Sequence, residues 1–320
     1  MTKPKLNASS RIMREEAQKR GVQCTTFGDN ETILMEKNGK TWYTRGSRTS
    51  LQSSIGRTIA DSKYITKKIL SHFNIPTAKF VLVKKIEDLA KIKQLNFPLV
   101  MKPVRGAHGR GVIVGVKTKQ EAKNYFLQAG SKVIFEEVLK GTEYRIICID
   151  YKFVGATFRK AAFITGDGKN TIKELVKIKN QDPNRQAGHK GNLTLIEIDK
   201  VVIENLSEQK MTPDTIPAKN EEVFLRKTAN LSTGGEPHDY SHLVCKENKE
   251  LFSKIAKACD LNSVGIDIMC QSLETPIVDQ KNVGVIEVNA SPGLRMHHFP
   301  LVGKSINVAS KILDMVMTKK

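Results

Sequence analysis

The stretch from Phe97 to Val112 joins a short apolar strand that ends in a lysine to a basic loop rich in glycine. An ammonium group at the end of an apolar strand is costly unless an anion meets it, and here the candidate is Lys102. Three glycines within six residues let backbone N–H groups approach phosphate oxygens closely. The spacing is neither that of a Walker A loop nor that of a Rossmann fingerprint. It predicts another kind of nucleotide-phosphate cover, made by Lys102, Gly106, His108, Gly109 and Gly111.

A second pattern near the C-terminus supplies oxygen ligands for a metal ion. Glu287 and Asn289 lie two residues apart on an apolar strand, so their side chains share a face. Asp267 lies on the strand 264–268, which can run alongside. Carboxylate and amide oxygens suit Mg²⁺, with phosphates and water completing its shell, and Mn²⁺ is the alternative. The competing interpretation is a pair of polar strand ends that face solvent; the apolar flanks favour the metal.

Two further segments complete the candidate site. Arg226 opens a cationic loop that ends in Ser232-Thr233-Gly234-Gly235, and its guanidinium could hold a transferring phosphoryl group. Asn230, in the same loop, could be a further ligand, although Ser-Thr-Gly-Gly alone would be a flexible turn. Glu136, Glu137 and Val138 end a strand, as a hinge between lobes would, and could offer backbone groups to adenine.

The charge balance narrows the class of partner. The chain of 320 residues has 52 Lys and Arg against 33 Asp and Glu, a formal net charge of +19, which favours anionic partners. A solvated basic surface without a dedicated partner is the alternative. The lysines are spread along the chain and there is one Trp, so nucleic acid is disfavoured. The sequence contains no apolar run that would predict a membrane span or a signal peptide, so we expect a cytoplasmic protein. The five cysteines show no CxxC pairing, so we expect free thiols.

A chain of 320 residues can hold two or three lobes. We expect three α/β lobes with mainly antiparallel sheets: residues 1–76, 77–138 and 139–320. Asn38-Gly39 predicts a hairpin, and Asp61-Ser62 predicts the start of a helix whose buried face holds Ile65, Ile69, Leu70 and Phe73. Residues 181–222 predict a polar, turn-rich insertion or loop. We expect the other helices at 8–20, 118–129, after Thr171, at 251–259 and at 306–317, and the other strands at 79–83, within 99–116, and at 133–138, 143–149, 152–158, 264–270 and 283–289.

These motifs, in this order, resemble the ATP-grasp superfamily of carboxylate–amine ligases. The likeness is strongest to the ATP-grasp modules of cyanophycin synthetases and of bifunctional glutathione synthetases, from about residue 63 to residue 313. Beyond the segments above, it rests on Lys63 before Thr66-Lys67, on the motif Gly141-Thr142-Glu143-Tyr144-Arg145, on residues 165–168 and on residues 287–295.

The resemblance implies an ATP-grasp α+β fold with ATP held between the central and C-terminal lobes. It implies that Lys63 and Lys102 grip the phosphates, that residues 136–139 receive adenine and that Glu143 contacts the ribose. It places Mg²⁺ at Asp267, Glu287 and Asn289, and it assigns Arg226 and Arg295 to the cations that steady an acyl-phosphate. The implied reaction is attack of a carboxylate on the γ-phosphate, followed by attack of an amine to form an amide.

Three alternatives stay open for the function. The lead is a ligase that acts on a small-molecule carboxylate and amine. The second modifies an acidic protein or peptide tail, which the net charge would help to attract. The third is a non-catalytic ATP-binding regulatory module. The missing extra domains of the relatives predict a stand-alone module, and the family suggests a homodimer.

Overall fold

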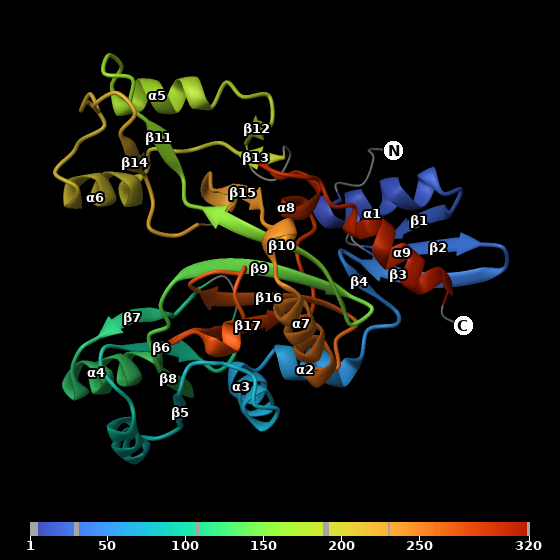
Figure 1. Cartoon of the computed structure of the whole chain (residues 1–320), viewed down its shortest axis with the longest axis horizontal. Helices are drawn as coiled ribbons and strands as arrows, with labels where there is room; N and C mark the ends of the chain where they lie inside the picture. The colour runs from blue at the N-terminus through green and yellow to red at the C-terminus, as the bar shows by residue number, and fades with distance from the viewer. Residues whose placement is uncertain (1–5, 29–31, 107–108, 188–191, 230, 319–320) are drawn as a thin grey trace.

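The computed structural model describes residues 6–28, 32–106, 109–187, 192–229 and 231–318. Three main sheets organise them, all antiparallel: β1-β2-β3-β4, β5-β8-β6-β7 and β15-β10-β9-β16-β17. In Figure 1 the five-stranded sheet is central, the second sheet lies below it at the left, and the first lies at the right beside both chain ends. The α+β architecture with mainly antiparallel sheets is therefore confirmed.

The helices and strands follow the chain in alternating groups. The helices are α1 (Ala8–Lys19), α2 (Ser54–Ala60), α3 (Lys63–His72), α4 (Lys119–Ala129), α5 (Ile172–Lys179), α6 (Lys200–Glu208), α7 (Lys246–Ala258), α8 (Arg295–His298) and α9 (Val308–Thr318), with 3-10 turns η1 (Ile86–Gln94), η2 (Leu231–Thr233), η3 (Ser241–Leu243) and η4 (Ile277–Asp279). The strands are β1 (Gln23–Phe27), β2 (Thr32–Lys37), β3 (Lys40–Arg45), β4 (Arg48–Thr49), β5 (Phe80–Val83), β6 (Leu99–Pro103), β7 (Ile113–Val116), β8 (Val133–Glu137), β9 (Thr142–Ile149), β10 (Lys152–Lys160), β11 (Phe163–Thr165), β12 (Arg185–Gln186), β13 (Leu193–Thr194), β14 (Glu222–Phe224), β15 (Glu236–Asp239), β16 (Ser263–Cys270) and β17 (Gly284–Asn289).

Local turn and cap chemistry is confirmed where the sequence predicts it. Asn38 and Gly39 have φ angles of 52° and 74°, as a two-residue hairpin turn requires, and they join β2 to β3. Thr171 and Glu174 form the reciprocal capping box of α5. Ser62 accepts a hydrogen bond from the Ile65 backbone N–H at the start of α3. These features depend on residues a few positions apart, so the sequence reveals them directly.

The prediction for the apolar face of α3 is wrong in part: Leu70 is buried and Ile69 is half-buried, but Ile65 and Phe73 are exposed. Ile65 and Phe73 are 37% and 43% exposed, whereas the buried residues are Thr66, Lys67 and Leu70. The helix therefore turns a lysine toward the interior, where it meets a carboxylate from the neighbouring sheet. An apolar pattern cannot identify that face, because the charge partner lies far away in sequence.

The segment 181–222 is folded where the structure describes it, at residues 181–187 and 192–222. It contains α6, which the sequence did not predict, and it contributes to a small apolar cluster with Ile164, Ile172 and Leu206. The strand pair β11–β14 closes this cluster. Figure 1 shows this part at the upper left, above the end of β10.

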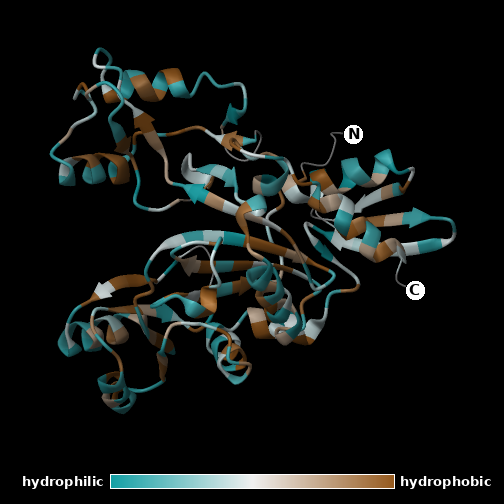
Figure 2. Cartoon of the chain, in the orientation of Figure 1, coloured by the Kyte–Doolittle hydropathy of each residue, from teal (hydrophilic) through white to brown (hydrophobic). Residues whose placement is uncertain are grey.

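Each face of the central sheet has a different environment. One face packs its apolar residues, including Ile146 and Ile266, against Phe252 of α7 and against α3. The other face packs Ile147 and Ile149 against α9, α1 and the first sheet. In Figure 2 the strands of this sheet carry brown, hydrophobic segments interrupted by teal ones. The first sheet thus shares its core with the C-terminal helix, and the division at residues 76 and 138 stays a prediction.

All five cysteines are free, and Cys148, Cys259 and Cys270 are buried, as predicted. No helix in the described part of the chain is long and apolar enough to cross a bilayer.

Candidate active site

A row of polar residues crosses the central sheet on one face. Residues directly opposite one another on five neighbouring strands form it, namely Asp239, Thr157, Arg145, Asp267 and Glu287. Adjacent strands place such partners side by side, so charged groups from distant parts of the chain meet here. Two of the predicted metal ligands, Asp267 and Glu287, are direct cross-strand partners.

Asp267 is buried and held by two arginines. Arg145 Nη2 donates to Asp267 Oδ2 at 2.8 Å, and Arg159 Nη2 lies 3.5 Å from Asp267 Oδ1. Burial raises the pKa of the Asp267 carboxyl, but Arg145 and Arg159, together with a hydrogen bond to Glu287, outweigh burial, and the pKa lies below its ordinary value. The carboxylate is therefore ionised, as a metal ligand must be.

Glu287 and Asn289 occupy the same edge of the site. Glu287 Oε2 lies 3.7 Å from Lys63 Nζ, and Asn289 Oδ1 accepts a hydrogen bond from the Ser291 backbone N–H at 2.8 Å. Among the described residues no group of three His, Cys, Asp or Glu side chains could by itself hold a metal ion. Two carboxylates and one amide oxygen nevertheless fit Mg²⁺, which binds few protein oxygens and takes the rest from phosphates and water.

Lys63 links the glycine-rich loop to the metal edge. Its Nζ donates to the Gly106 carbonyl oxygen at 2.8 Å while it faces Glu287. Gly109 and Gly111 lie in the same loop with φ angles of 71° and 72°, which glycine adopts without strain. His108 lies outside the described residues. The structure thus brings one predicted phosphate lysine, the loop and a predicted metal ligand together.

Lys102 projects from the end of β6 and forms an ion pair with Glu136 on the adjacent strand β8. Glu136 is almost fully buried, and its other carboxylate oxygen lies 2.8 Å from Lys67 Nζ. Glu137 and Val138 continue the chain toward the central sheet, and Glu137 Oε1 accepts from the Asn96 backbone N–H at 2.9 Å. The side chain of Glu136 thus forms ion pairs with Lys102 and Lys67. Binding of adenine by residues 136–139 stays a prediction.

The remaining predicted residues lie at different places. Glu143, at the start of β9, forms an ion pair with Arg159. Arg226 follows β14, and its Nη2 donates to Asp199 Oδ2 at 2.6 Å at the start of α6. Arg295 is the buried first residue of α8, and Asn230 lies outside the described residues. The structure does not join Arg226 to the polar row.

Sequence reasoning missed Arg145, Arg159 and Lys67 as members of this site. Arg145 stands two residues after Glu143, so strand alternation could have placed both on one face. Arg159 and Lys67 carry no local signal of this kind. Their roles depend on strand register and on helix rotation.

His297 adjoins the polar row and gives a prediction for pH dependence. Its Nδ1 lies 2.9 Å from Thr157 Oγ1, and burial together with Arg145 lowers its pKa from 6.5 to about 3. At a pH between the unfolded pKa of 6.5 and the folded pKa of about 3, this histidine is protonated in the unfolded chain and neutral in the folded chain. Acidification therefore favours unfolding. We expect this group to remove about 2 kcal/mol of stability between about pH 8 and about pH 5. Urea unfolding at both pH values would measure it.

The matched variant for that test is His297→Asn, whose amide can replace the bond to Thr157 but does not titrate. It should lose less stability on acidification than the natural chain. An equal loss in both proteins would contradict the assignment.

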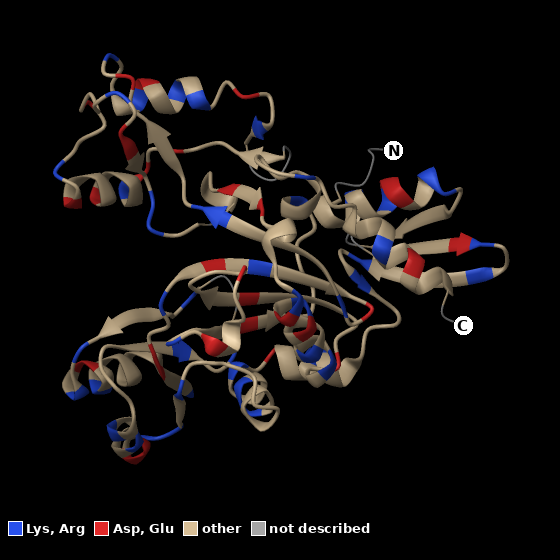
Figure 3. Ribbon diagram, in the orientation of Figure 1, with Lys and Arg blue, Asp and Glu red and all other residues tan. Residues whose placement is uncertain are grey.

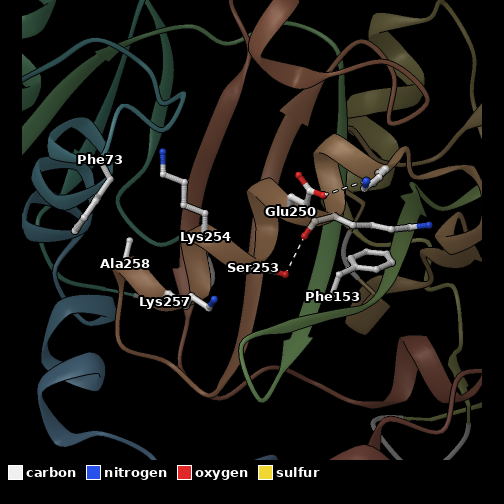
Figure 4. A pocket seen from close by; sticks show the side chains of 9 residues that line it. Phe73, Phe153, Glu250, Ser253, Lys254, Lys257 and Ala258 are labelled. Carbon is white, nitrogen blue, oxygen red and sulfur yellow. Dashed lines mark hydrogen bonds and ion pairs between the residues drawn. The ribbon is translucent and has the colours of Figure 1, made fainter.

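A concavity of about 760 Å³ lies elsewhere in the described residues. Phe73, Phe153 and residues of α7 line it, including Lys249, Lys254 and Lys257 (Figure 4). It contains none of the predicted site residues. The helix α7 packs on the face of the central sheet that carries Ile146 and Ile266, whereas Arg145 and Asp267 point to the other face, so this concavity and the polar row belong to opposite faces.

Comparison with known proteins identifies the family of the chain. Residues 61–167 match the family described as phosphoribosylglycinamide synthetase, ATP-grasp (A) domain, and residues 219–316 match the RimK-like ATP-grasp domain. The chain is 37% identical over 265 residues to a cyanophycin synthetase of Crocosphaera subtropica, across 81% of this chain and 30% of that protein. It is 30% identical over 320 residues to the glutathione biosynthesis bifunctional protein GshAB of Clostridium perfringens, across 97% of this chain and 41% of that protein.

A solved structure gives the same result for the fold. The crystal structure of a bifunctional glutathione synthetase from Pasteurella multocida matches with a TM-score of 0.79 and 27% identity, over 98% of this chain and 44% of that one. The chain therefore spans less than half the length of each of these three proteins.

Proposed function

Because the chain belongs to the ATP-grasp superfamily, we propose that it is an ATP- and Mg²⁺-dependent carboxylate–amine ligase. Its product would be an amide on an amino acid or small peptide. The observation that carries the proposal is the position of Lys63, whose Nζ contacts both the glycine-rich loop and Glu287. A cation between a phosphate loop and a metal-binding carboxylate is what transfer of a γ-phosphoryl group requires.

The residues divide the work by charge. Lys63, Lys102 and the loop amides would hold the phosphates, and Asp267, Glu287 and Asn289 would hold Mg²⁺, which supplies charge neutralisation when bound. Arg159 is partly exposed and lies between Glu143 and Asp267, so it is placed to meet a negatively charged substrate group. We therefore propose Arg159 and Arg145 as cations that stabilise the acyl-phosphate. Arg226 and Arg295, which the sequence indicated for this role, stay candidates.

The proposed reaction balances without a covalent enzyme intermediate. A substrate carboxylate oxygen attacks the γ-phosphorus of ATP, and ADP leaves with the electrons of the broken P–O bond. The amine then attacks the acyl carbon, phosphate leaves, and the nitrogen loses a proton. Such chemistry depends on positioning and on charge stabilisation more than on a nucleophilic side chain.

An acidic peptide as the acceptor is the second candidate. The formal net charge is +19, and Figure 3 shows lysines and arginines on every part of the fold. A surface of this kind raises the local concentration of acidic partners, and the effect weakens with salt.

The test is ADP release with Mg·ATP across pairs of carboxylates and amines, including amino acids, γ-glutamylcysteine and short acidic peptides. We expect ADP that depends on both substrates and disappears in Glu287→Gln. Release that depends on an acidic peptide would select the second candidate. Tight ATP binding without turnover on any pair would contradict both and favour a regulatory module.

A further inference from the structure

Lys67 is a fully buried lysine that the proposed reaction does not use. It lies on the inner face of α3 and is only 2% exposed. A buried ammonium group is costly unless it is paired, so its partners explain why it is there. Its Nζ lies 2.8 Å from Glu136 Oε2 and donates to Thr77 Oγ1 at 2.9 Å.

Glu136 connects Lys67 to the proposed phosphate lysine. Its carboxylate stands between two ammonium groups, with Lys67 on one oxygen and Lys102 on the other. Burial raises the pKa of the Glu136 carboxyl, but the two lysines outweigh burial and hold that pKa below its ordinary value. Two lysine side chains thus share one buried carboxylate, so an anion that meets Lys102 would complement a group that Glu136 satisfies only in part.

Thr77 connects Lys67 to the central sheet. The Thr77 hydroxyl donates to the Val285 carbonyl oxygen at 2.9 Å, and the two residues form a parallel bridge. Val285 lies on β17, two residues before Glu287. Lys67 is thus bonded on one side to the sheet that carries Lys102 and on the other, through Thr77, to the strand that carries a proposed metal ligand.

We propose that Lys67 is a positioning residue for the nucleotide site: it shares Glu136 with Lys102 and so leaves Lys102 available to the phosphates, at a fixed place relative to β17. The proposal rests on the ATP-binding role proposed above. Without Lys67, Glu136 would have Lys102 as its single ammonium partner among the contacts described here. An exclusive buried pair would hold Lys102 back from an incoming phosphate.

The experiment measures the dissociation constant of Mg·ATP by calorimetry in the full chain. Lys67→Met keeps the length of the side chain and removes its charge, and we expect it to weaken binding about tenfold or more, because misplaced groups lose affinity steeply. Lys68→Met is the matched control, since Lys68 is the next residue of the same helix and is exposed. It should bind as the natural chain does.

The double variant Lys67→Met with Glu136→Gln separates positioning from mere structure. Once Glu136 is neutral it no longer competes for Lys102, so binding should recover toward the natural value, as coupled residues do in a double-mutant cycle. Failure to recover would overturn the proposal, as would unchanged binding in a folded Lys67→Met variant.

If Lys67→Met does not fold, Thr77→Val is the second variant. It removes one hydrogen bond and should weaken binding about threefold. Unchanged binding in Thr77→Val would overturn the link to β17.

Absence of Mg·ATP binding in the natural chain is a different outcome. It would reject the proposed function itself, and with it the premise of this inference.

Discussion

Lys102→Met should lower amine-dependent ADP release by about a thousandfold, because each charge that stabilises a transferring phosphoryl group contributes on this scale. Lys102 is the penultimate residue of β6, shortly before the glycine-rich loop, and it faces Glu136. Methionine keeps the length and apolar character of the side chain and removes only the ammonium group. Steady-state ADP release at saturating substrates gives the comparison.

The control for this prediction is Lys123→Met, an exposed lysine on α4 of the same lobe. It should leave the rate unchanged. A Lys102→Met protein that folds and keeps its rate within a few-fold would remove Lys102 from the site. A thermal unfolding scan of each variant establishes that the fold is intact.

Arg145→Met should cost roughly 3 to 5 kcal/mol of folding stability, because it leaves the buried carboxylate of Asp267 without its main partner. Arg145 is itself buried, and it contacts Asp267 through two guanidinium nitrogens. The remaining cation, Arg159, is 3.5 Å away and is shared with Glu143. The free energy of unfolding in urea would measure the loss.

Arg159→Met is the informative comparison for that result. Its partner Glu143 is 41% exposed, so loss of the pair should cost at most about 1 kcal/mol. Activity is expected to fall in both variants, whereas stability should fall mainly in Arg145→Met. Equal destabilisation would mean that the environment of Asp267 does not depend on Arg145 in the way described.

The central fold was largely predictable from the sequence because its signals are local. Strand alternation, the Asn38-Gly39 turn and the caps at Ser62 and Thr171 involve residues within a few positions of one another. The order of the motifs then indicated the superfamily. The helix α6 escaped prediction because its short pattern lies in a polar, turn-rich segment.

The candidate site was predictable only in part. The sequence placed Asp267 and Glu287 on two strands, and the structure shows that they are direct partners in the register. The sequence did not indicate that Arg145 pairs with Asp267, because the two residues are 122 positions apart. It also did not indicate the rotation of α3 that buries Lys67.

The sequence by itself determined the strands, turns, glycine-rich loop and ligand-bearing motifs, because these depend on neighbours along the chain. Only the tertiary structure decided which charges are paired. A buried ion pair depends on strand register and on helix orientation, and both are set by the packing of the whole core around Glu136 and Asp267.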